Sequence, residues 1–214
     1  MGRARRLVEP ATIPSREVFL SRLTQFLKRP EIGQIDEAWE LAKKCHMHEI
    51  RESGEPYLSH PVAVAWILID ELRVYDMRVV ILALLHDALE IKEPRIHITK
   101  KSLAALFGEL VAQDLYALAR KRHGKNKKEP LTLYHGRIIQ RHWPTIIVKL
   151  VDRLHNMRTL HNCSQEKQIR IAKETEVSYF PLCAELMRTI PLDYGGAAMY
   201  LRQELGRECH KYLK

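Results

Sequence analysis

The stretch MRVVILALLHDALE, residues 77–90, places ionisable side chains at the end of a segment that is otherwise suited to a protein core. From Val79 to Leu85 every residue is apolar, which is typical of a helix buried on all sides. His86 and Asp87 follow directly, and Glu90 lies four residues after His86. If the helix continues to Glu90, the His86 and Glu90 side chains lie on one face and can reach the same cavity.

An isolated carboxylate in a protein core is costly unless it is hydrogen-bonded, paired or bound to a metal. The His86–Asp87 pair therefore suggests two metal ligands, with Glu90 as a candidate proton-transfer group. The alternative is that the two residues only end the helix, where the helix dipole favours a cation. The dipeptide alone leaves both interpretations open.

The segments before this stretch also have helical periodicity. Ser15 is expected to cap a first amphipathic helix, and residues 35–45 continue the pattern in a second one. The polar turn RESGEP, residues 51–56, then leads to His60, which precedes Pro61, a favoured residue in the first turn of a helix. This order predicts that His60 lies at the N-terminal edge of a buried helix.

The segments after the stretch are predicted in the same way. Thr99 can cap a helix that stops at Gly108, and residues 109–121 form another amphipathic stretch. Residues 164–214 predict two further helical segments, broken around IPLDYGG, and we find no convincing strand. The sequence therefore predicts an all-α fold with a single compact multi-helix domain over residues 1–214.

Composition limits the class of protein. The chain has 214 residues, 46% of them hydrophobic, which is enough for one domain with a sizeable core. It has no apolar run of membrane-spanning length, and its basic N-terminus lacks the apolar centre of a secretory signal, so we expect a cytoplasmic protein. The four cysteines are widely spaced and form no CxxC pair, which argues against a disulfide framework or a zinc ribbon.

The net charge of +9 raises the question of a polyanionic partner. The densest basic run is RKRHGKNKK, residues 120–128, which contains a glycine and an asparagine and precedes Pro130. We favour an exposed, solvated loop over a nucleic-acid contact, and a phosphorylated small molecule could use the same positive charge.

A second polar group lies in IIVKLVDRLHNMRTL, residues 146–160. Ile147, Leu150, Val151, Leu154 and Met157 form an apolar stripe, and Lys149, Asp152, Arg153 and Asn156 form the opposite stripe. Alone, this pattern equally fits a solvated helix face. Beside a histidine–aspartate site, however, Asp152 becomes a further candidate metal ligand and Asn156 a substrate hydrogen-bonding group. Two histidines with two carboxylates suit a divalent ion with open water positions, such as Mn²⁺, better than a closed zinc site.

Three segments taken together resemble the HD hydrolase domain of the Rel/SpoT homologue family. They are RESGEPYLSHPVAVAWIL at 51–68, LLHDALE at 84–90 and KLVDRLHNMRTL at 149–160, and ETEVSYFPLCAEL at 174–186 is similar to a later family segment. The resemblance covers about residues 36–190. It implies an HD-domain fold and a small alarmone hydrolase that removes the 3′-diphosphate of guanosine tetra- or pentaphosphate in a Mn²⁺-dependent reaction, giving GDP or GTP and pyrophosphate.

The resemblance also implies roles for individual residues. His60, His86, Asp87 and Asp152 match the metal ligands of the family, and Glu90 matches the first of its two catalytic acids. Arg51 matches a residue near the guanine pocket, while Asn156 and Thr159 match positions that contact the nucleoside. Lys149, Arg153 and the basic loop could then neutralise phosphate charge. His46, His48, His135, His155 and His161 are expected to be ordinary surface or core histidines.

Two departures from the family pattern leave other functions open. Ile91 stands where the family usually has its second acid, and Glu52 stands where the family often has lysine. One alternative is a binding module that senses an alarmone without cleaving it. Another is a hydrolase of a different pyrophosphorylated substrate, such as an adenosine alarmone or, in a toxin-neutralising role, RNA. The sequence does not fix the oligomeric state.

Overall fold

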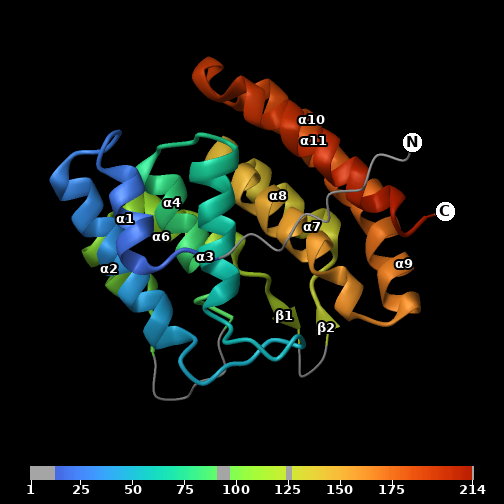
Figure 1. Ribbon diagram of the computed structural model, residues 1–214, viewed down its shortest axis with the longest axis horizontal. Coiled ribbons are helices and arrows are strands. Elements are labelled where there is room, and N and C mark those ends of the chain that lie inside the picture. The colour runs from blue at the N-terminus through green and yellow to red at the C-terminus, as the bar shows by residue number, and fades with distance from the viewer. Residues whose placement is uncertain (1–12, 91–96, 124–126, 214) are drawn as a thin grey trace, which may run out of the picture.

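The computed structural model describes residues 13–90, 97–123 and 127–213, and within them helices dominate (Figure 1). The α-helices are α1 Arg16–Leu23, α2 Arg29–Cys45, α3 Ser59–Trp66, α4 Met77–Leu85, α5 Lys100–Phe107, α6 Glu109–Leu118, α7 Leu131–Ile139, α8 Trp143–Arg158, α9 Gln165–Glu174, α10 Phe180–Thr189 and α11 Gly195–His210. A π-helical turn, Ile67–Glu71, extends α3, and another, Thr175–Tyr179, joins α9 to α10. Short 3-10 turns span Leu160–Asn162 and Leu192–Tyr194. The all-α prediction is confirmed.

Several predicted helix boundaries are present. The side chain of Ser15 accepts a hydrogen bond from the Val18 N–H at the start of α1, and Thr99 caps α5 in the same way. Gly108 ends α5 with φ of 87°, a left-handed value that glycine adopts without steric cost. These local signals were readable because each depends on neighbours within four residues.

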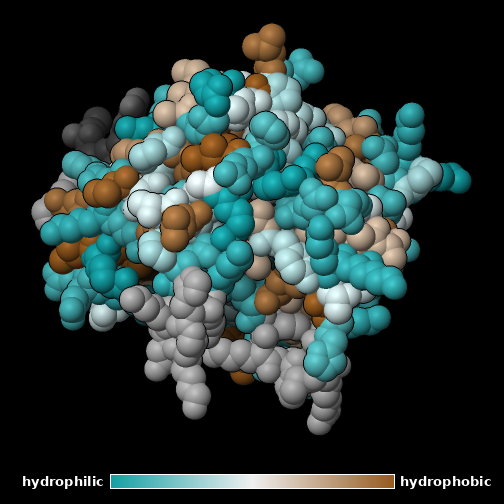
Figure 2. Space-filling model, turned by 180° about the vertical axis from the view of Figure 1, so that it is seen from behind, coloured by the Kyte–Doolittle hydropathy of each residue, from teal (hydrophilic) through white to brown (hydrophobic). Residues whose placement is uncertain are grey.

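Helix α4 is the centre of the core. All its residues from Val79 to Leu85 are buried, and α2, α3, α6 and α8 pack around it. Figure 1 shows α8 between α1–α4 on one side and α9–α11 on the other. The surface in Figure 2 is mainly hydrophilic, with hydrophobic side chains in separate patches. No helix in the described part of the chain is long and apolar enough to cross a bilayer.

The structure corrects two expectations. Helix α4 ends at Leu85, and the backbone then makes the i→i−3 hydrogen bonds Ala88 N to Leu85 O and Glu90 N to Asp87 O. Part of the basic loop forms a hairpin in which β1, Arg122–His123, pairs antiparallel with β2, Lys127–Lys128. Strands of two residues are too short to give a period-2 pattern, so the sequence could not show them.

Candidate active site

Three of the predicted metal ligands meet in the core. His60 comes from the first turn of α3, His86 directly follows α4, and Asp152 lies in the middle of α8. The three offer donor atoms that all lie within 4.8 Å of one another. The Nε2 atom of His60 is 3.2 Å from that of His86 and 3.1 Å from Oδ1 of Asp152. We call these three residues the donor cluster.

Asp87, the fourth predicted ligand, lies beside the donor cluster. Its Oδ2 atom is 3.3 Å from Nε2 of His86 and 3.6 Å from Nε2 of His60. The hydroxyl of Tyr57 donates a 2.7 Å hydrogen bond to the same oxygen. Asp87 is therefore held at the edge of the cluster, in contact with both of its histidines.

The ring of His86 is oriented by the backbone. Its Nδ1 atom lies 2.8 Å from the carbonyl oxygen of Ala83, which can only accept a hydrogen bond, so Nδ1 carries a proton. In the neutral ring, the Nε2 lone pair then faces His60 Nε2 and carboxylate oxygens. Lone pairs in such contact repel unless a cation lies between them, and imidazole nitrogens with carboxylate oxygens are the donors that divalent transition metals take. The donor cluster therefore fits a divalent metal ion.

The charges within the cluster support this interpretation. Burial lowers the pKa of His60. Burial also acts to lower the pKa of His86, but the carboxylates of Asp87 and Asp152 together with the Ala83 carbonyl outweigh it and raise the pKa to about 9, so the site favours a positive charge. Burial acts to raise the pKa of Asp152, but the Lys149 ammonium, 2.7 Å from Oδ2, holds it well below the usual range. The carboxylate stays ionised and available to a cation.

A cavity of about 410 Å³ opens beside Asp152. Its lining includes every residue predicted to contact substrate, namely Arg51, Lys149, Arg153, Asn156 and Thr159. It also includes residues that the sequence analysis did not single out, among them Tyr57, Asn162, Lys167 and Tyr179. The predicted substrate residues therefore share one cavity with a residue of the donor cluster.

Hydrogen bonds hold the polar side chains of this cavity in place. Asn156 Nδ2 donates to Asp152 Oδ1 over 2.6 Å, and an Arg51 nitrogen donates to Asn156 Oδ1 over 3.4 Å. Arg153 donates to Glu174 over 2.6 Å, and its guanidinium carbon lies 3.8 Å from the centroid of the Tyr179 ring. Arg153 thus pairs with a carboxylate and lines the cavity as well.

Glu52 and Lys167 form an ion pair at the mouth of the cavity. The Lys167 ammonium lies 2.8 Å and 2.7 Å from the two carboxylate oxygens of Glu52, and both residues line the cavity. Cys163, another lining residue, lies 3.4 Å from the same carboxylate. The negative charge that departs from the family pattern is therefore balanced by a lysine of α9.

Glu90 does not lie where a continuous helix would place it. Because α4 ends at Leu85, the condition under which Glu90 and His86 would share a helical face is not met. Its Oε1 atom instead accepts a 3.0 Å hydrogen bond from the backbone N–H of Arg120. Glu90 is not among the described residues that line the cavity.

Two other features of the sequence are only partly described. Ile91, which departs from the family pattern, and residues 124–126 of the basic loop lie outside the described residues. Lys128, at the described end of that loop, has its Nζ atom 3.9 Å from Oε2 of Glu90.

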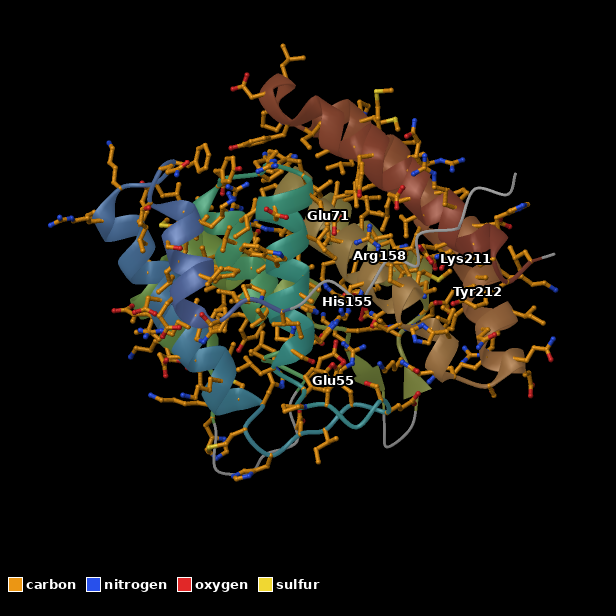
Figure 3. The ribbon with its side chains drawn as sticks, in the orientation of Figure 1. Glu55, Glu71, His155, Arg158, Lys211 and Tyr212 are labelled. Carbon is orange, nitrogen blue, oxygen red and sulfur yellow. The ribbon has the colours of Figure 1, made fainter. Side chains whose placement is uncertain are left out.

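His155 is a residue that the sequence analysis set aside. Its Nδ1 atom lies 2.9 Å from Nδ1 of His60 and 3.5 Å from an Arg51 nitrogen. Figure 3 labels it on α8, on the side that faces α3. Burial, followed by the charges of His60 and Arg51, lowers the pKa of His155 to about 2. Only its position next to Asn156 in the motif could have drawn attention to it.

Comparison with known proteins agrees with this geometry. Residues 38–129 match the family model described as HD domain. The chain is 36% identical over 173 residues to the bifunctional (p)ppGpp synthase/hydrolase SpoT of Escherichia coli K12, covering 78% of this chain and 24% of that protein. It is 37% identical over 155 residues to the guanosine-3′,5′-bis(diphosphate) 3′-pyrophosphohydrolase of Aquifex aeolicus, covering 72% and 21%. The chain spans about a quarter of the length of these relatives.

A solved structure has the same fold. It belongs to a metazoan ortholog of SpoT that hydrolyses ppGpp, and it matches with a TM-score of 0.62 and 21% identity over 85% of this chain and 97% of that chain. At this identity the likeness concerns the fold alone. The resemblance seen in the motifs is confirmed: residues 38–129 match an HD domain, and the chain is similar in sequence to (p)ppGpp hydrolases.

Proposed function

We propose that this protein is a metal-dependent phosphohydrolase that removes the 3′-diphosphate of guanosine tetra- or pentaphosphate, with Mn²⁺ as its metal. The single observation that carries the proposal is that Asp152, a member of the buried donor cluster, lines the same cavity as the predicted nucleotide-contacting residues. The names of the relatives support the choice of substrate. We further propose that residues 1–214 act as one domain in the cytoplasm on a small-molecule nucleotide.

The proposed roles follow from the positions of the side chains. His60, His86, Asp87 and Asp152 would hold the metal. When bound, a divalent cation supplies Lewis acidity and lowers the pKa of a coordinated water. Lys149 neutralises charge next to Asp152, which keeps that carboxylate ionised in the absence of substrate.

The cavity residues would bind the nucleotide. Arg51, Asn156 and Thr159 line one continuous surface and provide hydrogen bonds to the nucleoside. Arg153 and Lys149 bring positive charge to the diphosphate, because guanidinium and ammonium groups pair with phosphate oxygens. Glu90 is proposed to move a proton, and this role requires the turn after α4 to bring its carboxylate away from the Arg120 amide.

The test is product formation by the purified protein with guanosine tetraphosphate, with Mn²⁺ and with a chelator. We expect Mn²⁺-dependent release of GDP and pyrophosphate in equal amounts, and loss of both in the Asp152→Asn variant. If the metal-loaded protein forms no product, the hydrolase proposal is wrong.

A non-catalytic alarmone sensor is the second candidate, and the observation that favours it is the absence of the second acid at Ile91. Binding of guanosine tetraphosphate without cleavage would support this sensor, and restoring the acid with Ile91→Asp should then create activity. Cleavage of a matched adenosine alarmone but not of the guanosine compound would instead change the assigned base.

A further inference from the structure

We propose that His155 is the positioning residue of His60: it accepts a hydrogen bond from His60 Nδ1 and so turns the lone pair of His60 Nε2 toward the metal. This inference rests on the donor cluster of the proposed function. It assigns a role to a histidine that touches neither the donor atoms nor, among the described residues, the cavity.

The contact between the two rings requires one donor and one acceptor. Nδ1 of His60 and Nδ1 of His155 are 2.9 Å apart, and the ring planes are inclined by 50°. A hydrogen bond of this length needs a proton on one nitrogen and a lone pair on the other. Distance alone does not say which ring is the donor.

Arg51 decides the direction. One of its guanidinium nitrogens lies 3.5 Å from the same Nδ1 atom of His155, and a guanidinium can only donate. Nδ1 of His155 is therefore the acceptor for both neighbours. His155 is neutral and carries its proton on Nε2. Its Nδ1 atom accepts a hydrogen bond from the Nδ1–H group of His60.

The consequence for His60 follows from the chemistry of imidazole. A neutral ring that holds its proton on Nδ1 has a lone pair on Nε2. Nε2 of His60 lies 3.1 Å from Asp152 Oδ1 and 3.2 Å from His86 Nε2. His155 thus fixes His60 in the tautomer that a metal ion requires, at the position where the other donors converge.

The two histidines of the donor cluster are therefore oriented by different means. His86 is held by the backbone carbonyl of Ala83, which no side-chain substitution removes. His60 is held by a side chain of α8, 95 residues away in the sequence. Metal affinity should therefore depend on His155. If His155 only filled space, a substitution that keeps its bulk would leave metal affinity unchanged.

The experiment is calorimetric titration of the metal-free protein with Mn²⁺ and with Co²⁺, without any nucleotide. His155→Leu keeps the bulk but removes the acceptor, and we expect metal binding about 10- to 100-fold weaker, as is typical when the partner of a ligating histidine is lost. His155→Asn, whose Oδ1 can replace the Nδ1 acceptor, should recover most of the affinity. His161→Leu, which removes a histidine outside the cluster, should bind like the wild type.

Two further measurements report on the histidines directly, and the second of them needs no variant. The visible spectrum of bound Co²⁺ should change in His155→Leu, because the ring of His60 is free to turn. In the wild type, ¹⁵N NMR should show His155 Nδ1 unprotonated and Nε2 protonated.

The proposal is overturned if His155→Leu folds and binds both metals like the wild type, or if NMR finds the proton on His155 Nδ1. Because no nucleotide is present, these results are separate from the test of alarmone hydrolysis. A protein that binds metal through His155 but cleaves no alarmone would keep this inference and refute the proposed function.

Discussion

Asp152 of the donor cluster and the Glu52–Lys167 ion pair at the mouth line the same cavity, yet different forces hold the cluster and the mouth. His60, His86 and Asp152 are 2%, 4% and 5% exposed, whereas the side chains of Glu52 and Lys167 are 71% and 36% exposed. Water screens the ion pair at the mouth, which limits its energy, while burial makes each unpaired group in the cluster costly. Substitutions should therefore have large effects in the cluster and small effects at the mouth.

The largest effect is expected in the donor cluster itself. His86→Gln removes the Nε2 atom that would bind the metal and the Nδ1–H group that donates to the carbonyl oxygen of Ala83. A catalytic metal contributes several kcal/mol to transition-state stabilisation, so its loss should lower kcat/KM for guanosine tetraphosphate by about 1000-fold or more. Steady-state kinetics together with metal analysis measures this loss. Near wild-type activity in a variant without bound metal would show that the donor cluster does not hold a catalytic metal.

The pH dependence of the free energy of unfolding tests the environment of His135, a buried histidine next to the cavity. His135 packs against the ring of Tyr179, which lines the cavity, with ring centroids 4.8 Å apart. Burial, followed by the charge of Lys149, lowers the pKa of His135 to about 4 from the ordinary value of 6.5. Between these values the unfolded chain binds a proton that the folded chain does not, so His135 makes the folded state less stable as the pH falls.

His135→Phe should remove this effect. The free energy of unfolding should fall less in the variant than in the wild type between pH 6.5 and 4, by up to about 3 kcal/mol. Denaturant unfolding in chelator at several pH values measures the difference between the two proteins. Identical slopes in both proteins would show that His135 titrates normally.

A smaller effect is expected at the edge of the cluster. Tyr57→Phe removes the hydroxyl that donates to Asp87 and keeps the ring that stacks on His46. Loss of one such hydrogen bond to a ligand should weaken metal binding by about tenfold. Tyr116→Phe, on the exposed surface of α6, is the matched control and should bind metal normally. Equal metal affinities in both variants would mean that the hydrogen bond from Tyr57 to Asp87 does not contribute to metal binding.

The smallest effect is expected at the mouth. Glu52→Gln breaks an exposed ion pair, so the free energy of unfolding should change by about 0.5 kcal/mol or less. Removing a negative charge near a polyanionic substrate is worth about 1 kcal/mol in water, which should lower KM by about fivefold. Kinetics at low and high salt test this, because the gain should shrink at high salt. A 100-fold change in KM would show that substitutions at the mouth have effects as large as those in the donor cluster.

The sequence predicted the donor cluster because its members break an apolar pattern. His86 and Asp87 follow a fully apolar segment, and Asp152 lies in the polar stripe of a periodic helix. A buried ionisable group needs a partner, so His86 and Asp87 could be recognised from their immediate neighbours. Asp152 became a candidate only beside that pair, and the ligand role of His60 came from the resemblance of the motifs. The same local logic predicted the caps of α1 and α5.

The remaining features depend on contacts between distant segments. The end of α4 at Leu85 places Glu90 against the Arg120 amide, 30 residues away. The pair of Glu52 and Lys167 spans 115 residues. The bond between His60 and His155 joins two helices that the sequence predicted separately. No periodicity or spacing shows such pairings, because tertiary packing decides which helix faces meet.

The most direct test of the account is to locate the metal. Crystals of the protein grown with Mn²⁺ should show one anomalous scattering peak within bonding distance of His60 Nε2, His86 Nε2 and Asp152 Oδ1, with Asp87 turned toward it. A peak elsewhere, or none at saturating Mn²⁺, would contradict the claim that these buried groups form a metal centre.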